Sequence, residues 1–350
     1  MTNRDAGFAV DSGPELKIRR IGVIGCGRIG RMHADLLARE IPGFELAAVA
    51  DVVTAAAEGV SAKTGAAVMT IEELLADPAI DTVAICTSTD THVDMVVAAA
   101  QAGKAIFCEK PVSLNLALVD SALGAVEAAG VPFMVGFNRR FDPGHKSVRD
   151  AVAGGTIGDL HVLRITSRDP AAPPPEYVAV SGGIFLDMVI HDFDMAGYVV
   201  GSPVVDVYAR GAVRVDARIG EAGDIDTAVT VLTHEDGTIT TIDNSREAVY
   251  GFDQRVEAFG SGGMAISDNP KAHAGWSINR NATTAQPLPW FFLDRYTESY
   301  RQEWRAFHTY LTEGGPSPAD GPSVRACTAV ALAAGLSLKE GRTVQLKEIG

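Results

Sequence analysis

A glycine-rich loop near the start of the chain limits the possible folds most. Residues 25–30, Gly-Cys-Gly-Arg-Ile-Gly, directly follow the apolar run 21–24 and lead into a helical pattern. Between a strand and a helix, Gly25 permits a tight turn, Gly27 lets the backbone approach phosphates, and Gly30 lets the helix pack against the strand. The N–H groups and positive dipole end of the helix then attract negative charge. The pattern predicts a dinucleotide site formed by Gly25, Gly27, Arg28, Ile29 and Gly30.

An acidic residue follows the second predicted strand, residues 45–50. Asp51 lies 21 residues after Gly30, where a carboxylate is expected to bind the adenosine ribose hydroxyls. No Arg or Lys follows within several positions, and a carboxylate repels a 2′-phosphate, so NAD is favoured over NADP. The alternative is an ordinary strand-to-helix turn in which the Asp caps the helix.

Length and charge restrict the class of protein. A chain of 350 residues predicts two domains, and a net charge of −14 argues against nucleic acid or anionic membranes as partners. We expect no membrane-spanning stretch, and we expect residues 1–17 to be a poorly ordered extension without the apolar region of a secretory signal. The four cysteines show no C-x-x-C spacing, which favours reduced core thiols in a cytoplasmic protein and no metal site.

The first part of the chain alternates between strand and helix patterns, which predicts an α/β fold with a doubly wound parallel (Rossmann) sheet over residues 18–138. Ligands bind at the carboxyl ends of such strands. The predicted strands cover 20–25, 45–50, 66–69, 81–86, 105–108 and 132–136, and the predicted helices cover 28–40, 53–64, 71–77, 91–102 and 113–129.

The pattern changes in the second part, residues 139–350. A helix at 144–153, a strand at 160–168 and a long helix at 183–200 precede a run of strands, which predicts an α+β domain with a large mixed or antiparallel sheet. These later strands are expected at 204–215, 225–234, 238–245, 252–260 and 263–267. Closing helices at 295–313 and 323–339, which can pack back on the first domain, precede a short strand at 343–347.

The predicted helix 183–200 carries three polar residues in apolar surroundings. Asp187, His191 and Asp194 are spaced i, i+4 and i+7, so they share one face of a regular helix. Asp187 can then set the tautomer of His191 and raise its basicity, as a general base requires. The alternative is a buried His–Asp pair with a purely structural role. A metal site is a third possibility that no further ligand pattern supports.

Lys110 directly follows the fifth predicted strand and precedes Pro111. At that edge of a dinucleotide fold, an ammonium group can bind a substrate hydroxyl, stabilise a developing alkoxide or move a proton. The alternative is a solvated loop lysine. Pro111 favours an extended backbone at Lys110 and is compatible with a cis peptide bond.

Together these motifs resemble the glucose–fructose oxidoreductase/inositol dehydrogenase/rhizopine-catabolism family, with the myo-inositol 2-dehydrogenase branch as the nearest part. The resemblance covers nearly the whole chain after residue 18. It is carried by the glycine-rich loop, Thr-Ser-Thr-Asp-Thr-His at 87–92, Glu-Lys-Pro at 109–111 and Gly-Gly-x3-Asp-x3-His-Asp at 182–192. For the branch it is carried by segments at 136–142, 244–246, 250–255 and 291–296.

The resemblance implies roles for single residues. Lys110 binds the reacting hydroxyl, His191 takes its proton, and Asp187 orients and binds the polyol. Asn138 departs from the apolar residue expected before the Arg pair. The substrate pocket is expected to include Arg140, Asp169 and Tyr250, and the cofactor site is expected to include Thr87, Thr89, His92, Glu109 and Lys110.

The resemblance therefore implies an NAD-dependent dehydrogenase that oxidises a secondary hydroxyl of a cyclic polyol, with myo-inositol as the expected substrate and 2-keto-myo-inositol as the product. It also implies a homo-oligomer, a dimer or tetramer, in which the outer face of the second sheet packs against another subunit. The alternatives are the same chemistry on an aldose or another inositol isomer, and a noncatalytic NAD-binding sensor. Either Lys110 or His191 can be the primary proton acceptor.

Overall fold

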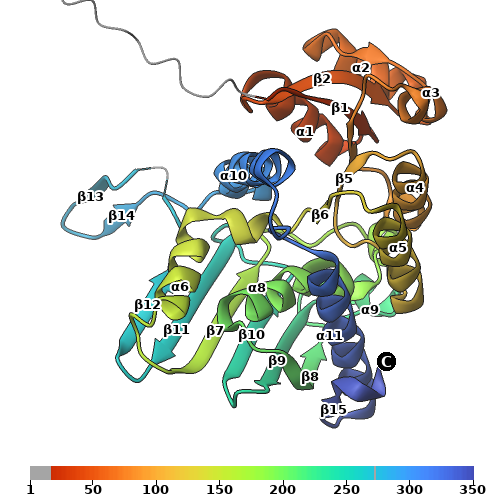
Figure 1. The fold of residues 1–350 in the computed structure, drawn as a ribbon. Coiled ribbons are helices and arrows are strands. Elements are labelled where there is room, and N and C mark those ends of the chain that lie inside the picture. Colours follow the sequence, from red (N-terminus) through yellow and green to blue (C-terminus); the bar gives the residue numbers. More distant parts are fainter. Residues whose placement is uncertain (1–16, 272) are drawn as a thin grey trace, which may run out of the picture.

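Two sheets organise the chain in the computed structural model, which describes residues 17–271 and 273–350 (Figure 1). The expected N-terminal extension lies outside the described residues except for Lys17, whose carbonyl accepts a hydrogen bond from His308 Nε2 at 2.8 Å.

The first sheet has six parallel strands in the order β3-β2-β1-β4-β5-β6, which confirms the doubly wound prediction. Strand order reverses between β1 and β4, so the loops after these strands form the crevice in which dinucleotides bind. The strands are β1 (Arg19–Ile24), β2 (Phe44–Ala50), β3 (Ala67–Val68), β4 (Thr82–Ile85), β5 (Ala105–Cys108) and β6 (Phe133–Val135). The helices are α1 (Arg28–Arg39), α2 (Thr54–Thr64), α3 (Ile71–Ala76), α4 (Thr89–Gln101) and α5 (Leu116–Ala129).

The second sheet has seven strands in the order β12-β11-β7-β10-β9-β8-β15. Its β7–β10 pair is parallel and its other pairs are antiparallel, which confirms a mixed sheet. The strands are β7 (Leu160–Arg168), β8 (Val204–Ala212), β9 (Thr227–His234), β10 (Ile239–Ser245), β11 (Asp253–Gly260), β12 (Gly263–Ser267) and β15 (Val344–Gln345).

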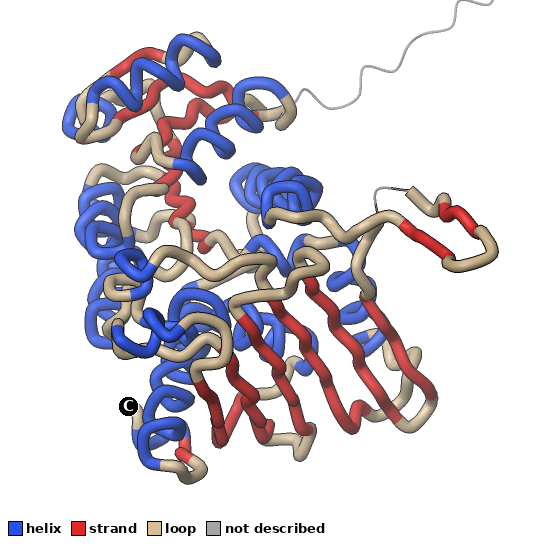
Figure 2. The backbone as a smooth tube through the Cα atoms, turned by 180° about the vertical axis from the view of Figure 1, so that it is seen from behind, coloured by secondary structure: helices blue, strands red, loops and turns tan. Residues whose placement is uncertain are grey.

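Helices cover only one face of this sheet. The covering helices are α6 (Pro143–Ala153), α8 (Ile190–Val200) and α11 (Gly321–Glu340) (Figure 1). Leu163, Ile165 and Ser167 of β7 are buried on the covered side, whereas alternate residues of the strand are more exposed. Figure 2 shows the opposite side, where the strands face the viewer without a helix in front of them. We call this side the open face.

The single helix expected over residues 183–200 is instead two elements. A five-residue π-helical turn, η2 (Phe185–Val189), leads directly into α8. Two short helices that the sequence patterns did not predict flank this region, α7 (Pro175–Val178) and α9 (Ala217–Glu221). The π-turn widens the helical repeat, so residues before and after it no longer share the face that regular spacing predicts.

The last part of the chain connects the two sheets. Helix α10 (Phe292–Glu313) contacts α1 as well as η1 (Asn138–Phe141), and α11 contacts α5, β6, α8 and β8. By length and composition α11 could cross a membrane, contrary to expectation, but over half of its most apolar window is buried within the protein. The chain ends in η3 (Leu346–Glu348).

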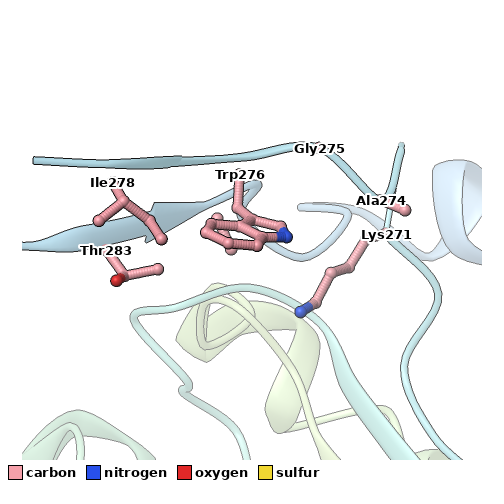
Figure 3. Close-up of a pocket in the computed structure, with 7 residues that line it drawn as sticks. Lys271, Ala274, Gly275, Trp276, Ile278 and Thr283 are labelled. Atoms are coloured by element: carbon pink, nitrogen blue, oxygen red, sulfur yellow. The ribbon is translucent and has the colours of Figure 1, made fainter.

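A hairpin of β13 (Trp276–Ile278) and β14 (Thr283–Ala285) projects from the second sheet as an arm (Figure 1). It is a further element that the patterns did not predict. Figure 3 shows a hollow along the arm, lined by residues that include Lys271, Trp276 and Thr283. This hollow belongs to the arm, and none of its lining residues is a predicted site residue.

Candidate active site

The loop between β1 and α1 has the backbone that a dinucleotide requires. Gly25 has a φ of +97°, and a Cβ there would lie 2.6 Å from the carbonyl carbon of Cys86. A Cβ on Gly30 would lie 1.8 Å from the oxygen of Gly25, whereas a Cβ on Gly27 would meet no atom within 4 Å. Gly27 therefore leaves space beside the start of α1, which carries no side-chain cap and no acidic residue in its first turn within the described structure. These features fit a pyrophosphate.

Asp51 lies next to this loop at the end of β2. Its Oδ2 accepts a hydrogen bond from the Cys26 N–H at 2.6 Å, and its Oδ1 accepts one from the Val53 N–H at 2.8 Å. The carboxylate is thereby fixed beside the glycines, and the next two side chains, Val52 and Val53, are exposed and uncharged. This arrangement fits a ribose with a free 2′-hydroxyl.

The segment after β4 starts α4 beside the same loop. The hydroxyl of Thr91 donates to Thr87 Oγ1 at 2.7 Å, and Thr89 is the first residue of the helix. Cofactor contacts of Thr87 and Thr89 stay predictions. His92, in contrast, is buried below this surface, with Nδ1 2.8 Å from the carbonyl oxygen of Pro111 and Nε2 3.1 Å from that of Thr87. Both its ring nitrogens thus contact loop carbonyls, which disfavours the expected contact with the nicotinamide ribose.

Lys110 connects the first sheet to the π-helical turn. It follows β5, its peptide bond to Pro111 is cis, and its Nζ donates to the backbone oxygen of Asp187 at 2.8 Å. An ammonium group has three N–H donors, so two remain for a ligand. The solvated-loop alternative is therefore wrong for Lys110.

His191 lies at the start of α8, near Lys110. Burial and the charges of Lys110 and Arg139 hold the pKa of His191 well below its usual value. Its Nδ1 is buried and has no hydrogen-bond partner among the described residues. The imidazole is therefore neutral at neutral pH and able to accept a proton.

The expected Asp187–His191 pair is wrong. The carboxylate of Asp187 instead accepts a hydrogen bond from the Tyr177 hydroxyl at 2.8 Å and pairs with Arg246 Nη1 at 3.1 Å. Asp187 lies within the π-helical turn whereas His191 follows it, so the i, i+4 relation of a regular helix does not hold. Asp194, the third member of the predicted face, also binds a different partner.

That partner is Arg140, whose Nε and Nη2 donate to the carboxylate of Asp194 at 2.8 and 2.6 Å. Its Nη1 donates to the carbonyl oxygen of Pro318. This buried bidentate pair disfavours Arg140 as a substrate ligand. The neighbouring Arg139 is closer to the site, since its charge acts on His191 and Asp169, and it pairs with Asp192 at 2.5 Å.

Asp169 and Tyr250 lie in different surroundings. Burial, with smaller contributions from the carboxylates of Asp187 and Asp192, raises the pKa of Asp169 to about 6 against the opposing charges of Arg139 and Arg246. The Tyr250 hydroxyl instead donates to Asp253 at 2.7 Å and accepts from Arg168 Nη1 at 3.0 Å.

Tyr250 is about half exposed and lines a depression together with Arg168, Val229 and Asp243. Val229 and Asp243 are register partners with exposed or half-exposed side chains, so this depression is on the open face. Tyr250 is therefore separated from the Lys110–His191 site of its own chain by the sheet.

Glu109 is buried in the first domain rather than free at the nicotinamide site. Its Oε1 lies 2.7 Å from His33 Nε2, and its Oε2 accepts the Lys110 N–H at 3.2 Å. The indole N–H of Trp304 donates to His33 Nδ1 at 2.9 Å. Because an indole nitrogen only donates, the proton of His33 is on Nε2 and is donated to Glu109. This chain of bonds links α10 to the backbone of Lys110.

Comparison with known proteins places these features in a family. Residues 19–137 match the oxidoreductase family with an NAD-binding Rossmann fold, and residues 145–266 match the GFO/IDH/MocA C-terminal domain. A myo-inositol 2-dehydrogenase from Thermotoga maritima is 47% identical over 332 residues, which cover 94% of this chain and 99% of that protein. The chain belongs to the GFO/IDH/MocA oxidoreductase family.

Solved structures of this family agree in fold. A myo-inositol dehydrogenase from Corynebacterium glutamicum is 38% identical, with a TM-score of 0.89 over 94% of this chain and 99% of that one. A scyllo-inositol dehydrogenase from Lactobacillus casei, solved with NAD(H) and scyllo-inositol, is 28% identical, with a TM-score of 0.88 over 95% of this chain and 100% of that one. This chain is therefore an oxidoreductase with an NAD-binding Rossmann domain.

Within this GFO/IDH/MocA chain, sequence reasoning missed four groups near the site: Arg139, Asp192, Tyr177 and Arg246. The Arg139–Asp192 and Arg140–Asp194 pairs join an Arg-Arg sequence to an Asp-x-Asp sequence, and this matched spacing was a usable signal. Arg246 is part of the Asn-Ser-Arg segment at 244–246, which carried the resemblance without a role. No pattern marked Tyr177.

No group of three or more His, Cys, Asp or Glu side chains suited to a metal occurs in residues 17–271 and 273–350.

Proposed function

We propose that this protein is an NAD-dependent inositol dehydrogenase that oxidises myo-inositol to 2-keto-myo-inositol. The observation that carries the proposal is the bond from Lys110 Nζ to the backbone oxygen of Asp187 at 2.8 Å, which brings the ammonium to the start of α8, where His191 lies. The charge of Lys110 also lowers the pKa of the imidazole. Lys110 follows the carboxyl end of β5, the edge of the sheet at which dinucleotides bind. The relatives named above as myo-inositol dehydrogenases support the choice of substrate.

The neutral imidazole of His191 is suited to take the proton of the reacting hydroxyl. Lys110, already anchored to the Asp187 carbonyl, has free N–H groups that can bind the same oxygen and stabilise negative charge on it. This assignment makes His191 the proton acceptor and Lys110 the electrostatic partner. The carboxylates of Asp187 and Asp169 accept hydrogen bonds from neighbouring ring hydroxyls.

The residues of the first domain would hold the cofactor. The backbone at Gly25, Gly27 and Gly30 suits the pyrophosphate, and Asp51 suits the adenosine ribose. NAD, when bound, supplies the acceptor for the hydride that leaves the substrate carbon.

The test is NADH formation when the purified protein is mixed with NAD and a panel of myo-inositol, scyllo-inositol, other inositol isomers and aldoses. We expect the highest kcat/KM with myo-inositol, and a much lower value when NADP replaces NAD. A preference for scyllo-inositol, the ligand of the Lactobacillus casei structure, would change the substrate and keep the reaction. NAD binding without turnover of any polyol would instead favour a sensor.

The assembly and location are also proposals. Apolar side chains on the open face support a homo-oligomer, with a tetramer as the expected form: Val229, Phe259, Met264 and Ile266 are each about half exposed. All four cysteines are free and buried, which supports a reducing, cytoplasmic location.

A further inference from the structure

The segment between β7 and η2 brings a tyrosine to the candidate site. Residues 170–184 include α7, and Tyr177 of that helix donates its hydroxyl proton to Asp187 Oδ1 at 2.8 Å. Tyr177 is about half exposed, but partial desolvation of its hydroxyl and the Asp187 carboxylate raise its pKa, so the hydroxyl stays protonated and remains a donor. The charges of Arg246 and of Arg28, which belongs to the nucleotide loop, oppose this increase in the pKa.

Arg246 holds the other oxygen of the same carboxylate. Its side chain is only 2% exposed, and it lies 3.1 Å from Asp187 Oδ2 and 3.4 Å from Asp224 Oδ2. Asp224 is itself fixed, because its Oδ1 accepts the Ile184 N–H at 3.1 Å. The carboxylate of Asp187 therefore lies between a rigid, buried cation and a neutral hydroxyl from a surface segment.

This arrangement leaves Asp187 able to bind a ligand. A carboxylate has about four acceptor positions, and Tyr177 and Arg246 use two of them. The side chain is still 13% exposed, and the backbone oxygen of the same residue anchors Lys110. Any rotation of the Asp187 side chain would therefore move its free acceptor positions, which lie near the Lys110 ammonium.

We propose that Tyr177 is a positioning residue that holds the Asp187 carboxylate in the direction needed to bind the ring hydroxyls of a polyol. Arg246 alone contacts one oxygen and leaves the side chain free to turn about that contact. The Tyr177 hydroxyl removes this freedom. The inference rests on the proposed polyol dehydrogenase function.

The test is Tyr177→Phe, which keeps the ring and removes only the hydroxyl. We expect kcat/KM for the polyol to fall about 10-fold or more, as for the loss of a hydrogen bond to a charged group, mainly through a higher KM. The KM for NAD should stay within about twofold, since the nucleotide loop is unchanged. Tyr310→Phe is the control, because it removes a tyrosine hydroxyl from α10, away from both the candidate site and the open face. It should behave like the wild type.

A double variant separates positioning from general packing. If Tyr177 acts through Asp187, then Tyr177→Phe should cause little further loss in an Asp187→Ala background. Equal losses in both backgrounds, unchanged kinetics, or a lower polyol KM in Tyr177→Phe would each overturn the proposal. A wild-type protein that neither reduces NAD with any polyol nor binds one would overturn the proposed function as well.

Discussion

At the scale of single residues, the neighbouring charges decide the protonation state of His191, the candidate base. His191 is near two cations, Lys110 and Arg139, and its Nδ1 has no partner in the described part of the chain. A carboxylate bonded to the imidazole, as the sequence predicted, would raise its pKa, whereas these surroundings lower it. Burial and the like charges therefore keep His191 unprotonated, and the Asp187 carboxylate binds Tyr177 and Arg246 instead of His191.

Removing either group should stop the chemistry and spare cofactor binding. We expect His191→Ala and Lys110→Ala to lower kcat by about 10²-fold to 10⁴-fold, the usual contribution of general acid–base catalysis. The dissociation constant for NADH, measured by fluorescence titration, should change less than about threefold. His273→Ala, at an exposed histidine just before β13 of the arm, is the control. Near-native turnover in either variant would remove that residue from the mechanism.

Asp169 gives the free energy of unfolding a defined pH dependence. Its pKa is raised from 3.8 to about 6, so the folded state holds this proton more tightly than the unfolded state. The stabilisation from protonated Asp169 is present below pH 3.8 and is lost as the pH rises through 6. Above pH 6, the ionised Asp169 therefore lowers the free energy of unfolding by at most about 3 kcal/mol.

Asp169→Asn should therefore raise the free energy of unfolding by up to about 3 kcal/mol at pH 8, and by less at pH 5. Urea unfolding at the two pH values measures this difference. The same variant should lose activity, because an amide accepts fewer hydrogen bonds from a polyol. Asp243→Asn, which removes a surface ion pair with Arg168, should show no such gain. A gain of equal size at both pH values would contradict the assignment.

At the scale of elements, periodicity predicted most of the fold. The strands of both sheets were located within a few residues, because their apolar runs are bounded by glycine and polar turns. The π-turn at 185–189 was not predictable, since its sequence is as apolar and regular as that of α8. The π-turn is short, but it removes the i, i+4 relation that would have placed Asp187 and His191 on one face of a regular helix. Among site residues, the glycine loop, Asp51 and Lys110 follow from their place after a strand, whereas Tyr177 depends on a tertiary contact.

Helix α10 supports Lys110 through Trp304, His33 and Glu109. Trp304→Phe removes the indole donor and leaves His33 Nδ1 buried without a partner, in addition to a small cavity beside Phe107. We expect a loss of about 2–4 kcal/mol in the free energy of unfolding, measured in urea. Trp276→Phe on the exposed arm should change it by less than about 0.5 kcal/mol. If the two variants unfold at the same urea concentration, the hydrogen bond from Trp304 to His33 does not stabilise the protein.

At the scale of the whole molecule, the two faces of the second sheet differ. One face is buried under α6, α8 and α11, and no helix lies over the open face (Figures 1 and 2). Several apolar side chains of the open face are exposed. Phe259 and Met264 are register partners, which places them side by side, and Ile266 follows on the same strand face. The exposed Arg164–Glu257 ion pair lies beside them on the same face. Soluble monomers rarely expose several large apolar side chains together, whereas subunit interfaces of about 800 Å² per partner commonly combine apolar and charged groups in this way.

Phe259→Asp should therefore dissociate the protein. A buried, unpaired carboxylate at a subunit interface costs several kcal/mol, whereas the same carboxylate on an isolated subunit is solvated. We expect light scattering after size exclusion to give an oligomeric mass for the wild type and a lower mass for the variant at low micromolar concentration. The control is Leu118→Asp, which places the same charge at a half-exposed apolar position on α5 and should keep the wild-type mass. If Phe259→Asp keeps the oligomeric mass, the subunits associate through another surface. A monomeric wild type would show that the open face is not a subunit interface.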